Sequence, residues 1–146
     1  MGTVQAEQGR IMSEANRAFK ARNFEAAYEM YGAALRMDES NVGMATKLLC
    51  NRAIAALRLK RLDEAIQDAS AALYYKEAYP KAYATRAAAY LQAKRYAETI
   101  EDYKKACRLE PSVPEHERQL RQAEADYAKL QAKTAAAPPP PATPVA

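Results

Sequence analysis

Apolar residues recur at helical spacing along most of the chain, and the same pattern is repeated three times. The clearest copy runs from Leu48 to Leu73, where two apolar runs are separated by the basic pair Lys60-Arg61. The alternation typical of strands does not recur, and the chain has only 4 glycines among 146 residues. The pattern therefore predicts an all-α chain built from pairs of antiparallel helices.

Six columns of residues align when the three copies are superimposed on the small residues at positions 27, 65 and 99, which are 38 and 34 residues apart. Each column keeps its character, small or bulky and apolar, in almost every copy. The columns are Ala15/Ala53/Ala87, Phe24/Leu62/Tyr96, Ala27/Ala65/Thr99, Tyr28/Ile66/Ile100, Ala34/Ala72/Ala106 and Leu35/Leu73/Cys107. Such columns indicate close packing of two helices per unit, because a small residue on one helix accommodates a large side chain of its neighbour.

These residues resemble the tetratricopeptide repeat (TPR) family, whose unit is a 34-residue helix–turn–helix with small residues at the helix crossing and an aromatic residue opening the second helix. The first interval is four residues longer, and we place the excess in ESNVGMATK, between repeats one and two. The resemblance implies three TPR repeats, at about 8–41, 46–79 and 80–113, stacked as a right-handed α-solenoid.

The two ends of the chain differ from the repeats. Residues 1–8 are expected to be disordered, so that the TPR domain is predicted over 9–133. The segment 113–133 predicts an amphipathic helix that caps the exposed end of the stack. Its apolar residues recur at Leu120, Ala123, Tyr127 and Leu130. Residues 134–146 are rich in proline and alanine and predict a disordered, polyproline II-like tail that acts as a tether. The alternative is that its PPPP run recruits a proline-recognition domain.

Composition and charge narrow the class of function. The net charge of +4 is mild, so it favours an acidic peptide partner over nucleic acid, which usually requires a denser basic stripe. No apolar run approaches the 18 residues of a membrane span. The two cysteines, Cys50 and Cys107, do not suggest a disulfide framework. We expect a cytoplasmic protein that binds neither nucleic acid nor membrane, and a monomer, because a capped stack leaves no large apolar face.

Residues suited to catalysis are sparse. His116 is the one histidine, and it is expected at the exposed start of the last helix. The acidic pairs Asp63-Glu64 and Glu101-Asp102 are expected on solvated surfaces of second helices. No glycine-rich phosphate loop and no cluster of residues at metal-ligand spacing is present in the sequence. We therefore expect no enzymatic activity, no cofactor and no metal.

In the TPR family, the first helix of each repeat lines a concave groove, and the family pattern identifies which residues face it. Here those positions are Gly9, Met12, Ser13, Asn16, Lys20, Lys47, Cys50, Asn51, Ile54, Arg58, Lys81, Ala84, Thr85, Ala88 and Gln92. Four of them are basic and none is acidic. The resemblance therefore implies that the groove binds an extended acidic peptide or a C-terminal carboxylate, with the two asparagines as hydrogen-bonding groups.

The resemblance is greatest to co-chaperone TPR domains, in particular to the second TPR cluster of J-domain co-chaperones that carry several repeats. The segments that carry it are NRAFKARNFEAAYEMYGAAL, KLLCNRA, RLDEAIQDASAAL and KAYATRAAAYL, although the chain has no HPD tripeptide. It is thus expected to be either a TPR module of a longer protein or a different small co-chaperone.

In those domains, a two-carboxylate clamp holds the C-terminal EEVD of heat-shock protein 70 and/or 90. Asn16, Asn51 and Lys81 match three of the five clamp positions, whereas Met12 and Thr85 stand where the family has Lys and Arg. The alternative is a TPR scaffold that binds a different acidic or extended peptide in an unrelated complex. Two neighbouring arginines, Arg10 and Arg86, are poor substitutes for the missing cations. Both begin about 100–200° away around their helices.

Overall fold

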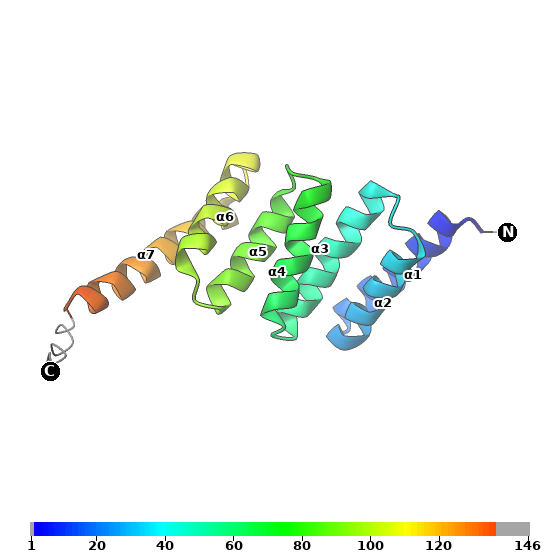
Figure 1. Ribbon diagram of the computed structural model, residues 1–146, viewed down its shortest axis with the longest axis horizontal. Coiled ribbons are helices and arrows are strands. Elements are labelled where there is room, and N and C mark those ends of the chain that lie inside the picture. The colour runs from blue at the N-terminus through cyan, green and yellow to red at the C-terminus, as the bar shows by residue number, and fades with distance from the viewer. Residues whose placement is uncertain (1, 137–146) are drawn as a thin grey trace, which may run out of the picture.

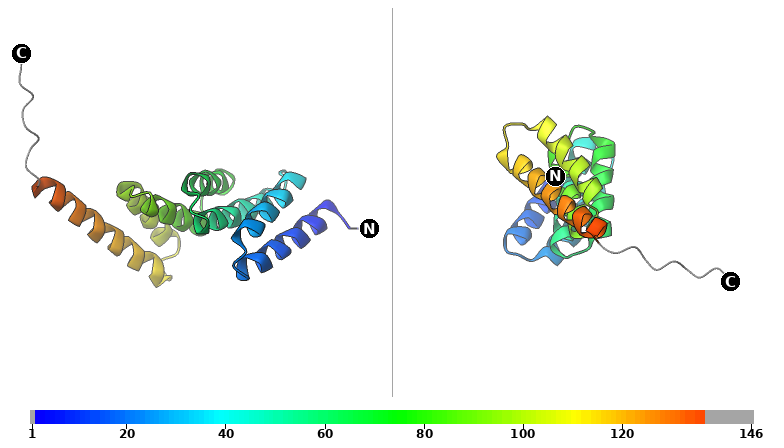
Figure 2. Two further views of the ribbon diagram at one scale, coloured as in Figure 1. Left: turned by 90° about the horizontal axis from the view of Figure 1, so that it is seen from below. Right: turned by 90° about the vertical axis from the view of Figure 1, so that its left-hand side faces the viewer.

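The computed structural model describes residues 2–136, which form seven α-helices and no strand (Figure 1). The helices are α1 (Val4–Lys20), α2 (Phe24–Met37), α3 (Val42–Arg58), α4 (Leu62–Tyr75), α5 (Pro80–Gln92), α6 (Tyr96–Leu109) and α7 (Pro114–Ala136). The first six helices form three antiparallel pairs, each packed against the next, and α7 packs on α6 (Figure 1). The predicted all-α stack of helix pairs is confirmed for the described residues, with α1 and α7 at its opposite ends (Figure 2).

Alanine columns lie at the crossings between helices. Ala15 on α1 and Ala27 on α2 are fully buried, and so are their counterparts Ala53 and Ala65 on α3 and α4. A side chain this small allows the two helix backbones to approach closely, and the space between crossings is filled by large side chains. The largest fully buried ones include Tyr103 and Leu48. In contrast, Cys107, aligned with apolar core positions, is only partly buried.

The same turn joins the two helices of every repeat. Arg22, Lys60 and Lys94 occupy equivalent places with φ angles of 63°, 63° and 60°, in the left-handed region. In each turn, the amide N–H of the following residue donates to the carbonyl five residues earlier, as Arg61 does to Ala56 at 2.9 Å. This is the hydrogen bond of a Schellman motif, which terminates the first helix and directs the chain into the second.

Helix α1 begins earlier than the sequence indicated, so the expected disorder over residues 1–8 is wrong for residues 4–8. Thr3 caps the helix, since its Oγ1 accepts a hydrogen bond from the Ala6 N–H at 3.0 Å. The Gln8 side chain is buried, and its Nε2 donates to the carbonyls of Ala34 at 2.9 Å and Asp38 at 2.7 Å. Gln8 thereby binds the end of α2, and this tertiary contact extends α1 toward its N-terminus.

The excess residues of the first interval lengthen α3 by about one turn, as the sequence predicts. Helix α3 has 17 residues against 13 in α5, and it begins at Val42, two residues before the predicted start at Met44. The Asn41 side chain caps it by accepting a hydrogen bond from the Met44 N–H. Helix α7 continues to Ala136 instead of ending at 133. The remainder of the predicted proline-rich tail, residues 137–146, lies outside the described residues.

Helix α7 packs on α6 along its N-terminal part, as far as Tyr127. Ala123 is fully buried, and the Tyr127 ring stacks on Tyr96 with the ring centroids 6.0 Å apart. The C-terminal part of the helix extends away from the stack (Figure 2). Residues 128–136 are exposed, including Leu130. None of the seven described helices is both long enough and apolar enough to cross a membrane.

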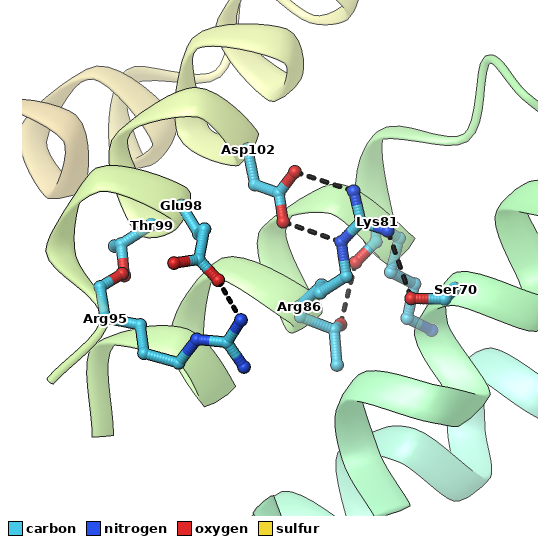
Figure 3. Close-up of polar contacts among 8 residues, drawn as sticks. Ser70, Lys81, Arg86, Arg95, Glu98, Thr99 and Asp102 are labelled. Atoms are coloured by element: carbon cyan, nitrogen blue, oxygen red, sulfur yellow. Dashed lines mark hydrogen bonds and ion pairs between the residues drawn. The ribbon is translucent and has the colours of Figure 1, made fainter. Parts of the chain in front are cut away.

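The same partly buried ion pair between an arginine and an aspartate occurs in two successive repeats. Arg86 on α5 donates from Nε and Nη2 to the carboxylate of Asp102 on α6, at 2.7 and 2.8 Å, and from Nη1 to Ser70 on α4 (Figure 3). Arg52 makes the same bidentate contact with Asp68 one repeat earlier, at 2.8 Å for both bonds. Asp102 is 3% exposed, so the expectation that this carboxylate is solvated is wrong. It fixes an arginine that connects two repeats.

Candidate functional site

Two adjoining cavities lie along the face of the stack formed by the first helices of the repeats and by α7. The N-terminal cavity, of about 300 Å³, is lined by Asn16, Phe19, Lys20, Tyr31, Asn51, Ile54 and Lys81. The C-terminal cavity, of about 510 Å³, is lined by Ile54, Leu57, Arg58, Lys81, Ala84, Thr85, Ala88, Glu110, Val113, His116 and Gln119. Because Ile54 and Lys81 line both, the cavities adjoin, and together they are called the groove, which extends from α1 to α7.

Asn16 is held in the N-terminal cavity by a tyrosine from the second helix of its repeat. The Tyr31 hydroxyl donates a hydrogen bond to Asn16 Oδ1. Tyr31 is almost fully buried, and burial raises the pKa of its phenol, so the hydroxyl keeps its proton and remains a donor. This contact uses one lone pair of the Asn16 carbonyl oxygen and leaves the NH₂ group of Asn16 available as a hydrogen-bond donor to a ligand.

Asn51 is oriented in the same sense by a lysine from the next repeat. Lys81 Nζ donates to Asn51 Oδ1 at 3.1 Å, so Asn51 also presents its NH₂. The Lys81 ammonium has three N–H groups, and this hydrogen bond uses one of them. The described residues that line the N-terminal cavity include no Asp or Glu, and Lys20 adds a second cation. Donors from α1, α3 and α5 therefore converge on one space, as carboxylate binding requires.

Met12 and Thr85, which replace clamp cations, contribute no charge to the N-terminal cavity. Met12 is partly buried and packs against the hydrophobic core. Thr85 is 7% exposed, and its Oγ1 donates to the Lys81 carbonyl of its own helix at 2.7 Å. Neither neighbouring arginine supplies the missing charge to the cavity. Arg86 is bound to Asp102 and Ser70, and Arg10 forms ion pairs with two glutamates of α1.

The remaining predicted groove residues are divided between the cavities and other sites. Arg58 lines the C-terminal cavity, and its guanidinium lies over the rings of Phe19 and Phe24, 5.7 and 5.6 Å from their centroids. Lys47 is exposed and lines neither cavity. Cys50, predicted to face the groove, is fully buried, and this burial raises the pKa of its thiol. The expectation for Cys50 is therefore wrong.

The C-terminal cavity differs in chemistry, because its walls are mainly apolar and it contains one carboxylate. Glu110 follows the last residue of α6, and its Oε1 lies 2.9 Å from His116 Nε2 on α7. The His116 side chain is 12% exposed, so its predicted exposed position is wrong. Sequence reasoning missed Glu110 and Tyr31, because it considered only the first helices of the repeats as the groove lining.

Comparisons with known proteins show the family and the fold of the chain. Residues 80–113 match the family described as tetratricopeptide repeat. The chain is 37% identical over 120 residues to human DnaJ homolog subfamily C member 7, covering 82% of this chain and 24% of that protein's length. The chain thus spans about a quarter of that relative.

Two solved structures have the same fold. One is the second TPR domain of human RPAP3 in complex with the heat-shock protein 70 peptide SGPTIEEVD, with 25% identity, a TM-score of 0.76, and coverage of 84% of this chain and 98% of that one. The other is the first TPR of Spaghetti (RPAP3) bound to the heat-shock protein 90 peptide SRMEEVD, with 29% identity, a TM-score of 0.75, and coverage of 83% and 93%.

Proposed function

Because the chain is a tetratricopeptide repeat domain, homologous to those of DnaJ homolog subfamily C member 7 and RPAP3, we propose that it binds the acidic C-terminal EEVD tail of heat-shock protein 70 and/or 90. The observation that carries the proposal is the polarity of the N-terminal cavity. Tyr31 and Lys81 each donate to one asparagine carbonyl oxygen, and this orientation leaves both NH₂ groups available to donate to a ligand. A carboxylate, which only accepts hydrogen bonds, is the ligand group that fits this set.

In this proposal, the terminal carboxylate of the tail lies among the amides of Asn16 and Asn51 and the Lys81 ammonium. Lys20, one helical turn beyond Asn16, supplies the second cation in the cavity. A hydrogen bond to a charged group contributes roughly 1.5–3 kcal/mol, so the loss of two clamp cations at Met12 and Thr85 costs up to about 3–6 kcal/mol before compensation by Lys20. We therefore expect weaker binding than in a domain that has all five clamp residues.

The proposed role is non-catalytic and cytosolic. Within residues 2–136, no three His, Cys, Asp or Glu side chains come together as metal ligands would. The imidazole of His116 contacts Glu110, and the described residues that line the C-terminal cavity include no serine or cysteine. Cys50 and Cys107 are free thiols, which suits a reducing compartment.

Calorimetric titration with SRMEEVD, as the free acid and as the C-terminal amide, tests the proposal. We expect carboxylate-dependent binding, with the amide at least tenfold weaker. Lys81→Ala should lower the affinity for the free-acid peptide by about tenfold, as the loss of one hydrogen bond to a charged group predicts. Lys104→Ala, which removes a half-exposed lysine of α6 outside the groove, is the matched control. Equal binding of acid and amide would instead support the alternative, a scaffold for a different extended peptide.

A further inference from the structure

The groove contains one carboxylate, and it stands at the end opposite the donor set. The other charged residues that line the two described cavities are Lys20, Arg58, Lys81 and, at the α7 end, His116. Glu110 is held in place from one side, because its Oε1 contacts His116, while its side chain remains 44% exposed. An acidic peptide therefore meets Lys20 and Lys81 where its C-terminus is bound, and farther along the groove it meets Arg58 together with the one carboxylate, that of Glu110.

The length of the groove indicates which ligand residue reaches Glu110. If the terminal carboxylate lies between α1 and α3, the upstream residues run toward α7. Packed helices are about 8–10 Å apart, and α3 packs on α5. Helix α7 packs on α6 and faces α5 across the C-terminal cavity, so two such spacings, about 16–20 Å, are the least distance from α3 to α7. An extended chain advances about 3.3 Å per residue, so the sixth residue from the C-terminus lies about 17 Å from the last one. Glu110 is therefore placed to meet that sixth residue.

The two tail peptides seen with related domains differ at this residue. The sixth residue from the end is Arg in SRMEEVD and Thr in SGPTIEEVD, whereas the fifth is apolar in both. The apolar walls of the C-terminal cavity, which include Ile54, Leu57 and Val113, suit Met and Ile equally well. A charged wall residue, in contrast, distinguishes Arg from Thr.

We propose that Glu110 makes this groove selective for EEVD tails that carry a basic residue at the sixth position from the C-terminus, as in SRMEEVD. The proposal rests on the function proposed above, and it adds a choice between the two kinds of tail. Glu110 acts as the specificity residue, and His116 positions its carboxylate. The Arg–Glu110 pair is partly solvated, so we expect a preference of about threefold, within the range measured for exposed ion pairs.

Titration of the chain with SRMEEVD, SAMEEVD and SGPTIEEVD tests the inference. The chain should bind SRMEEVD about threefold more tightly than SAMEEVD. Glu110→Gln keeps a polar side chain that still contacts His116, and it should abolish this preference while leaving SGPTIEEVD binding unchanged or slightly tighter. Glu124→Gln removes an equal charge from an exposed site of α7 outside both cavities, and it should keep the preference.

Charge reversal provides a second, independent variant. Glu110→Lys should prefer SEMEEVD to SRMEEVD. The inference is overturned if the wild-type chain binds SRMEEVD and SAMEEVD with the same affinity. It is also overturned if Glu110→Gln lowers the affinity for all three peptides by the same factor, because a purely structural role of Glu110 predicts that result. If the peptides bind through the free carboxylate but ignore the sixth residue, only this inference fails. If none of them binds, the proposed function fails as well.

Discussion

The orientation of the Asn51 amide can be tested with a nearly isosteric change. Asn51→Asp replaces an NH₂ donor by a second acceptor oxygen and alters the size of the side chain very little. In the structure, Asn51 Oδ1 already accepts from Lys81 Nζ at 3.1 Å, so an aspartate keeps this contact and converts it into an ion pair. What it loses is the hydrogen bond that Asn51 is proposed to donate to the ligand carboxylate.

The expected magnitude follows from that lost donor. A hydrogen bond to a charged group contributes roughly 1.5–3 kcal/mol, and about 1.4 kcal/mol corresponds to a tenfold change in affinity. The donor alone therefore accounts for a loss of about 10- to 100-fold. The added negative charge repels the carboxylate and also neutralises Lys81, so we expect a loss of 100-fold or more for SRMEEVD.

Calorimetry with the free-acid peptide measures this loss, and thermal unfolding checks the fold. Because Asn51 is only half-buried and keeps its contact with Lys81, stability should change by less than about 1 kcal/mol. Asn41→Asp is the matched control: it adds the same charge to the N-cap of α3, where aspartate caps as well as asparagine. Unchanged affinity of the Asn51→Asp variant would refute the donor orientation of Asn51.

Three further changes test other features of the structure. Thr85→Arg restores a clamp cation and should strengthen SRMEEVD binding by about tenfold in the same titration, whereas a neutral result would show that the ligand does not reach this position. Asp102→Asn leaves the Arg86 guanidinium without its carboxylate and should lower the free energy of unfolding by about 3 kcal/mol in urea; a change below 1 kcal/mol would mean that the pair is dispensable. Lys94→Gly relieves a left-handed backbone and should raise the stability by about 0.5–1 kcal/mol, and a loss of stability would contradict this account of the turn.

The fold could be predicted because its determinants are local and repeated. The small residues that allow helices to cross recur in every repeat, as Ala15 and Ala53 do, and their spacing is visible in the sequence. The start of α1 could not be predicted in this way. It depends on Gln8, which contacts carbonyls 26 and 30 residues away, and no local pattern contains that information.

The candidate site was predicted in part, for a related reason. Asn16, Asn51 and Lys81 lie on the first helices, where the repeat geometry fixes the face that each side chain occupies. Cys50 was misplaced because it precedes Asn51 by one residue, and a step of 100° around the helix carries its side chain into the core. Glu110 lies beyond the end of α6, outside the repeated columns, so only the packing of α7 against this segment reveals it.

In the proposed complex, the side-chain amides of Asn16 and Asn51 donate hydrogen bonds to a ligand carboxylate. Their NH₂ resonances in a ¹⁵N-resolved NMR spectrum report this contact directly. On addition of SRMEEVD as the free acid, we expect both pairs of NH₂ signals to shift, whereas the amidated peptide should shift them little and the Asn41 signals should stay in place. If SRMEEVD binds and the Asn16 and Asn51 signals remain where they were, the ligand does not lie in the N-terminal cavity and the account is wrong.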